Sequence, residues 1–157
     1  MKKVLLGLVC LLSLVSCSKE ISVIYVYGLV IRATDPSEIT DAGKRDAYES
    51  FLHDMQRDFA PEYYFYEPNK IDVIKEEVGV KMIPENLPAE DEKMIAKFDD
   101  YLTRIQAAEA SCRERLEDLD ELDGVPFTIK GKFLLRRGRE GDKSEFLKEY
   151  RFELKKD

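Results

Sequence analysis

The sequence predicts a two-layer α+β domain in which helices pack on one face of a small antiparallel or mixed sheet. Three observations support this: a strand pattern near the N-terminus, amphipathic helix patterns in the middle, and two alternating strand patterns at the end. Helices laid over one face of a sheet bury such apolar stripes most simply. We therefore expect the order β-α-α-α-β-β in a single domain over residues 21–157.

The first predicted strand and helix follow from residue type and spacing. Residues 21–31 (ISVIYVYGLVI) are rich in β-branched and aromatic side chains, which favours a strand. Both alternating sets are apolar, so we expect both faces of this strand to be covered. After a turn at 34–37, Thr40 or Asp41 can cap a helix that extends to Phe59. Its apolar stripe consists of Ala47, Tyr48, Phe51, Leu52, Met55 and Phe59.

The middle of the chain predicts one short and one long helix. The short helix covers 69–78, with Gly79 as a left-handed stop, and residues 80–83 form a short strand or a loop. From Glu90 onward, apolar residues keep a three-or-four spacing that is typical of a long helix. Carboxylates crowd residues 117–123, where the helix dipole disfavours them, so we expect the helix to fray there.

The C-terminal segment predicts a β-hairpin. Residues 127–136 and 146–154 both alternate between apolar and polar side chains. Residues 138–141 (GREG) suit a short hairpin loop between the two strands. In the register that this loop sets, Phe133 lies opposite Phe146, and such cross-strand pairs stabilise a sheet.

Composition excludes several classes of protein and site. The chain has 157 residues, 44% hydrophobic and 36% charged, which excludes a disordered polar tail and a multi-spanning membrane protein. A single histidine, His53, excludes zinc sites that need two. Asp118, Asp120, Asp123 and Gly124 suggest a calcium loop, but the ligand positions of that loop do not fit the sequence. We therefore expect no metal and no cofactor.

The N-terminal segment predicts export. Residues 1–17 (MKKVLLGLVCLLSLVSC) contain two lysines, an apolar run and a cysteine. The apolar run over 4–16 covers only about 20 Å as a helix, short of the ~30 Å hydrocarbon core of a bilayer. The end of the run, Leu14-Val15-Ser16-Cys17, resembles the lipobox of bacterial lipoproteins. This resemblance implies that residues 1–16 are removed and that a diacylglycerol is attached to the Cys17 thiol.

The resemblance to bacterial lipoproteins also implies a location and a first partner. The partner is the lipid bilayer, reached through acylated Cys17, and the location is the cell envelope. Ser18 favours the outer membrane, while the periplasmic and the surface side both remain open. Residues 17–20 form a very short tether, since four residues span at most about 14 Å. The folded domain must then lie almost on the bilayer, and nucleic acid is excluded as a partner of this exported, acidic chain.

Two groups of side chains are candidates for binding. Tyr63, Tyr64 and Tyr66 form an aromatic run that suits stacking on a sugar ring or a peptide side chain; the alternative is loop closure over the core. A second group is basic, because residues 125–157 carry ten basic and six acidic side chains, a net charge of +4. Anionic head groups would attract this group, and the alternative is pairing with glutamates across the strands. Its members are Lys130, Lys132, Arg136, Arg137 and Arg139.

Two further residues carry chemistry that we expect to be structural. Cys112 lies on the apolar stripe of the long predicted helix, where cysteine packs as a small hydrophobic residue, so we expect it to be buried. His53 lies at the border of an apolar helix face, where it packs or forms a hydrogen bond rather than acting as a general base.

No catalytic set emerges from the sequence. It therefore favours a non-catalytic binding or scaffolding module of the cell envelope, held close to the membrane, with an envelope protein or a glycan as partner. One alternative is a carrier of an apolar ligand, with a pocket between the sheet and Tyr48, Phe51 and Met55. A second alternative is a hydrolase that uses two carboxylates.

The lipobox makes a direct prediction about acylation. Bacterial cells grown with an alkyne-tagged fatty acid should label the wild-type protein and not Cys17→Ala, because the acyl chains depend on that thiol. Gel fluorescence after coupling to a dye measures the label. Equal labelling of both proteins, or of neither, would contradict the anchor.

Overall fold

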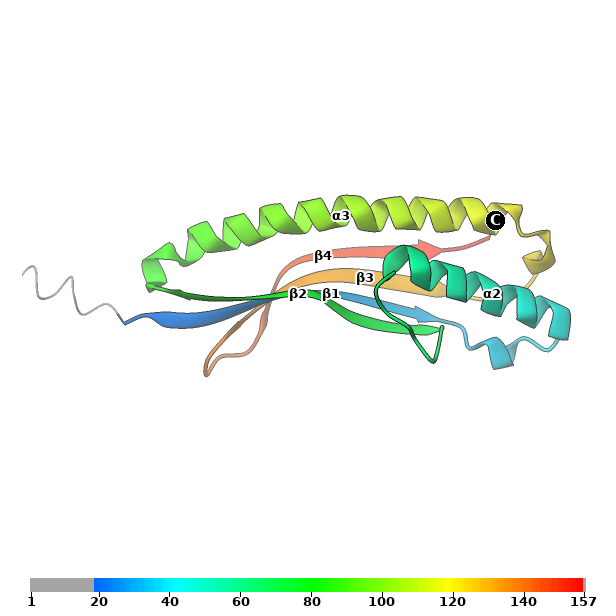
Figure 1. Cartoon of the computed structure of the whole chain (residues 1–157), viewed down its shortest axis with the longest axis horizontal. Helices are drawn as coiled ribbons and strands as arrows, with labels where there is room; N and C mark the ends of the chain where they lie inside the picture. Colours follow the sequence, from blue (N-terminus) through cyan, green and yellow to red (C-terminus); the bar gives the residue numbers. More distant parts are fainter. Residues whose placement is uncertain (1–18, 157) are drawn as a thin grey trace, which may run out of the picture.

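Residues 19–156, which the computed structural model describes, form a four-stranded antiparallel sheet with two α-helices on one face (Figure 1). The predicted signal segment and the predicted lipidation site Cys17 lie outside the described residues. The elements are β1 (Ile21–Ala33), α2 (Ala42–Phe59), β2 (Lys70–Met82), α3 (Leu87–Asp118), β3 (Ile129–Arg139) and β4 (Glu145–Leu154). The strand order across the sheet is β2-β1-β3-β4. This confirms the α+β class, whereas the expected succession of three helices between the strands is wrong.

The central strand β1 pairs with both β2 and β3. Its odd-numbered side chains from Val23 to Ile31 are buried under the helices. Its even-numbered side chains lie on the opposite face of the sheet, which neither α-helix of residues 19–156 covers, and Ile24 is 45% exposed. The expectation that both faces of this strand are covered is therefore wrong.

The segment predicted as a short helix is instead most of the edge strand β2. Ile71, Ile74 and Val78 have the three-and-four spacing of a helix, which is the pattern that misled the prediction. A β-bulge at Lys75 explains this spacing: it adds one residue between the partners of Tyr27 and Gly28. Residues after the bulge therefore change face, so Val78 joins Ile71 on the helix side.

Both long helices form where the spacing predicts them. Asp41 caps α2, since its Oδ1 atom accepts a hydrogen bond from the Lys44 backbone N–H at 2.9 Å. The α3 helix begins three residues earlier than predicted, at Leu87, with Pro88 in its first turn, where the missing N–H costs nothing. It ends at Asp118, in the expected acidic segment. Its 32 residues span about 48 Å, close to the ~43 Å of the 13-residue β1, so the helix follows the full length of the sheet.

The β3–β4 hairpin forms in a different register from the predicted one. Phe133 pairs with Tyr150 rather than with Phe146, and the connection covers residues 140–144. The shift is four residues, so Tyr150, Phe152 and Leu154 still face the helices, whereas Phe146, beyond the irregularity in the pairing, lies on the opposite face of the sheet. The observed register places the Phe152 ring opposite Gly131, where a side chain would leave it no room. The pairing of β3 with β4 has an irregularity between Leu135 and Arg136.

Gly131 provides a test of this register. A Cβ atom at Gly131 would overlap the Phe152 ring, which stacks on Phe59 with centroids 5.1 Å apart and has little freedom to move. Gly131→Ala should therefore lower the free energy of unfolding by about 1–3 kcal/mol in urea denaturation. Gly79→Ala is the matched control, because its Cβ meets nothing within 4 Å. In a Phe152→Ala background, Gly131→Ala should no longer lower the free energy of unfolding. If it still lowers the free energy of unfolding there, the register is contradicted.

Candidate functional site

The sheet face that points away from the helices is the first candidate surface, here termed the open face. Its apolar members are Ile24, Val26, Val30, Ile74, Leu134 and Phe146. Its basic members are Arg32, Lys70, Lys81, Lys130, Lys132, Arg136 and Arg151, and its acidic members are Asp72, Glu77, Glu149 and Glu153. Exposed apolar side chains within a charged surround are typical of an interaction surface.

Large hydrophobic side chains on the open face are exposed to solvent. Ile24 is 45%, Ile74 is 50% and Phe146 is 65% exposed. They come from three different strands, β1, β2 and β4. Because sequence-distant segments contribute them, they form one surface only after the sheet has assembled.

Several cations of the open face have no ion-pair partner. Lys130, Lys132 and Arg136 make no ion pair within residues 19–156. Arg32 lies 3.7 Å from Asp72, and Arg151 pairs with its neighbour Glu149. Arg32, Lys130, Lys132 and Arg151, together with Val30, line an open hollow of about 480 Å³.

The structure separates the five basic residues that the sequence grouped together. Arg137 lies on the covered face, where it pairs with Asp91 of α3 and with Glu145 at 2.7 Å, and its side chain is only 14% exposed. Arg139 lies 3.8 Å from Asp142 in the hairpin connection. Arg32 and Arg151 were not among the predicted residues. The alternation of side chains along β1 and β4 already assigns each of them to one face of its strand.

The loop from 60 to 69 carries the aromatic run and lies along the edge of β2. The Tyr63 hydroxyl donates to the Ile74 carbonyl at 3.2 Å, and Lys75 Nζ donates to the Phe59 carbonyl at the end of α2. These contacts hold the loop at the β2 bulge and shield part of an edge strand. Tyr64 and Tyr66 take no part in the core, since they are 84% and 93% exposed.

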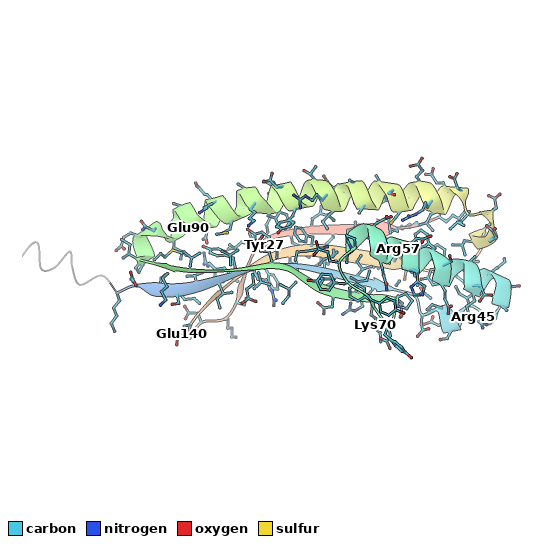
Figure 2. All side chains as sticks on the ribbon, in the orientation of Figure 1. Tyr27, Arg45, Arg57, Lys70, Glu90 and Glu140 are labelled. Carbon is cyan, nitrogen blue, oxygen red and sulfur yellow. The ribbon has the colours of Figure 1, made fainter. Side chains whose placement is uncertain are left out.

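A polar hollow of about 500 Å³ lies between this loop, the start of α2 and the turn after β1. Tyr66, Arg45, Glu49 and the exposed His53 contribute to its wall. Two backbone carbonyls orient Arg45: its Nε donates to the Ile39 carbonyl at 2.9 Å and its Nη2 donates to the Thr40 carbonyl at 3.3 Å. In Figure 2, Arg45 and Lys70 lie at one end of the molecule, and Glu90 and Glu140 lie toward the end where β1 begins. An exposed ring beside such polar groups can bind a sugar or a polar peptide side chain.

Charged side chains between α3 and β2 have structural partners. Glu76 accepts hydrogen bonds from Lys97 Nζ and from the Tyr101 hydroxyl, each at 2.6 Å, and these bonds lower the pKa of Glu76. Burial and the Glu76 carboxylate raise the pKa of Tyr101 to about 12. Burial also lowers the pKa of Lys75. These contacts tie the long helix to the edge strand.

Two places in the structure bear on the alternatives of a ligand carrier and of a carboxylate hydrolase. Tyr48, Phe51 and Met55 are buried in the core, and the Tyr48 ring lies 5.1 Å from the Phe127 ring. A hollow of about 280 Å³ between α2, β2 and α3 contains two acids, Asp58 and Glu62. Asp58 is already bound by an arginine of α3.

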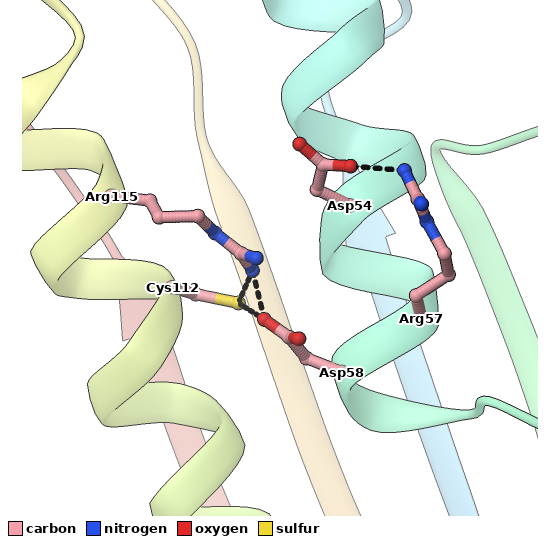
Figure 3. A network of polar contacts seen from close by, with 5 residues as sticks. All are labelled: Asp54, Arg57, Asp58, Cys112 and Arg115. Atoms are coloured by element: carbon pink, nitrogen blue, oxygen red, sulfur yellow. Dashed lines mark hydrogen bonds and ion pairs between the residues drawn. The ribbon is translucent and has the colours of Figure 1, made fainter.

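Cys112 confirms the prediction of a buried cysteine. Its Sγ donates to Asp58 at 3.5 Å, and Arg115 pairs with the same carboxylate, joining α3 to α2 (Figure 3). Asp54 and Arg57 form a second, exposed ion pair nearby on α2. Burial raises the pKa of Cys112 to about 12, so the thiol stays protonated and is a poor nucleophile at neutral pH.

Within residues 19–156, no three histidine, cysteine, aspartate or glutamate side chains gather closely enough to hold a metal ion. None of the helices described in that range combines the length and the apolar composition needed to span a membrane. No protein-family model matches the chain, and neither a curated protein nor a solved structure matches it significantly.

The environment of Cys112 predicts its reactivity and a pH dependence. A thiol reagent should modify Cys112 only after guanidinium unfolding, and Cys112→Ala should remove that reaction. The unfolded thiol ionises near its ordinary pKa of 9.0, whereas the folded one does so at about 12. The contribution of the Cys112 thiol to the free energy of unfolding is therefore fully present below pH 9, and it is lost as the pH rises from 9 to 12.

Urea denaturation at several pH values measures this loss. Between pH 9 and 12 the free energy of unfolding should fall more steeply with pH in the wild type than in Cys112→Ala. The difference between the two slopes corresponds to at most one proton. Rapid modification of the native protein would contradict the buried, protonated thiol.

Proposed function

We propose that this protein is a lipid-anchored, non-catalytic binding module of the bacterial cell envelope. The observation that carries the binding role is the exposure of Tyr64 and Tyr66, 84% and 93%, on a loop that the Tyr63 hydroxyl joins to the Ile74 carbonyl of β2. Large aromatic rings that the core does not use are typical of surfaces that bind a partner. The partner is an envelope protein or a glycan that reaches this loop.

The position of the loop fits a protein fixed to a surface at its other end. The loop joins β2 at Lys70, which pairs with Arg32 near the end of β1. The proposed anchor precedes Ile21 at the beginning of β1. Since β1 spans about 43 Å, the aromatic rings lie far from the point where the acylated tether would join the domain. The anchor then holds one end, and the binding loop stays accessible at the other.

The polar hollow beside Tyr66 indicates what kind of ligand group would fit. Arg45, Glu49 and His53 supply donors and acceptors next to an aromatic ring. A sugar offers hydroxyl groups for the polar side chains and an apolar ring face for the tyrosine, and a polar peptide side chain offers a similar combination. Neither ligand requires a nucleophile or a metal ion.

Two tyrosine substitutions test this function. Tyr64→Ala combined with Tyr66→Ala should abolish recovery of the envelope partner after crosslinking in cells. The melting temperature should hardly change, because exposed side chains contribute little to stability. Tyr64→Phe with Tyr66→Phe is the matched control: it keeps both rings and should retain the partner.

Two results would overturn the proposal. One is recovery of the same partner by the alanine variant. The other is a large fall in melting temperature, measured by differential scanning calorimetry, which would assign the rings to the structure rather than to binding.

A further inference from the structure

We propose that the open face of the sheet lies flat on the membrane and contacts anionic lipid head groups. The long axis of the domain is then parallel to the bilayer, and the helices face away from it. This inference rests on the lipid anchor proposed above and adds the orientation of the domain. It commits to one occupant of the open face, an anionic lipid surface.

The tether restricts the domain to two simple orientations. Four residues separate the beginning of β1 from the bilayer, a reach of at most about 14 Å. An upright domain would touch the membrane only with the end that carries Ile21 and the hairpin connection. A flat domain would touch it with a whole face of the sheet, because β1 is the central strand and runs the length of that face.

The side chains of the open face are those that a membrane surface binds. Ile24, Ile74 and Phe146 are exposed apolar groups that can enter the head-group region. Lys130, Lys132 and Arg136 have no ion-pair partner within residues 19–156 and are free to meet lipid phosphates. Each cation near an anionic leaflet strengthens the association about fivefold.

Charge separates the open face from the rest of the domain. The open face has seven basic and four acidic side chains, a net charge of +3. By contrast, α3 carries five basic and nine acidic side chains, a net charge of −4. An anionic surface therefore attracts the open face and repels the helix side. A second copy of the chain is disfavoured on this face, since two faces of charge +3 would repel each other.

The far end of β3 distinguishes the flat orientation from the upright one. Lys130 pairs with Arg32, eleven residues beyond Ile21, which corresponds to about 36 Å along the strand. In the upright orientation Lys130 is that far above the bilayer, whereas in the flat orientation it touches the head groups. Glu114 of α3 is at the same end on the helix side, next to Arg113, which binds the Glu153 carbonyl of β4.

The experiment places a fluorophore at these two positions of the acylated protein. Lys130→Cys and Glu114→Cys are labelled with a thiol-reactive dye, which Cys112 escapes because it is buried. Both proteins are reconstituted into vesicles of phosphatidylethanolamine and phosphatidylglycerol that contain a head-group spin-labelled lipid as quencher. We expect quenching at Lys130→Cys to be several times that at Glu114→Cys. Ile74→Cys, which keeps every cation, should be quenched as Lys130→Cys is.

Ionic strength and lipid charge supply the second measurement. The excess quenching at Lys130→Cys should fall in vesicles of phosphatidylcholine alone and in 1 M salt, where the Debye length is about 3 Å. Equal quenching at Lys130→Cys and Glu114→Cys would overturn the inference, and so would quenching confined to an Ile83→Cys variant near the tether. Mass spectrometry of the same samples separates this result from a failed anchor, which would show no acyl chain on Cys17.

Discussion

The one-sided burial of the central strand is the constraint on which the rest of this fold depends. β1 places a row of large side chains under the helices, including two tyrosines with no exposed surface. A buried tyrosine needs a partner for its hydroxyl, and both partners belong to α3. Tyr25 donates to Asp91 Oδ1 and Tyr27 to the Met94 carbonyl, each at 2.8 Å. These two bonds fix the beginning of the long helix relative to the sheet, and Arg137 of β3 binds the same Asp91.

One-sided burial also explains why the candidate surfaces lie where they do. Two helices are sufficient to cover one face of four strands, so the second apolar row of β1 stays outside (Figure 1). The bulge at Lys75 then turns Glu76 toward α3 and brings the end of α2 close to the β2 edge. Beside this bulge the Tyr63 hydroxyl of the loop 60–69 donates to the Ile74 carbonyl, while Tyr64 and Tyr66 are exposed to solvent.

Local pattern predicted most elements, and it failed where long-range pairing overrides spacing. The Asp41 cap, the stripe of α2 and the burial of Cys112 follow from residues a few positions apart. The bulge in β2 cannot be seen in that way, because the extra residue is defined only by the partner strand. The hairpin register has the same origin: the space at Gly131 becomes decisive only once the Phe152 ring lies across it.

The sequence by itself determined the α+β class, the two long helices, the two C-terminal strands and the spacing between Cys17 and the first strand. Only the tertiary structure decided which face of β1 the helices cover, and therefore which cations share a surface with Ile24 and Phe146. The physical reason is that alternation assigns side chains to two faces of a strand without saying which face is buried. That choice depends on the total apolar area of elements that are distant along the chain and meet only in the folded domain.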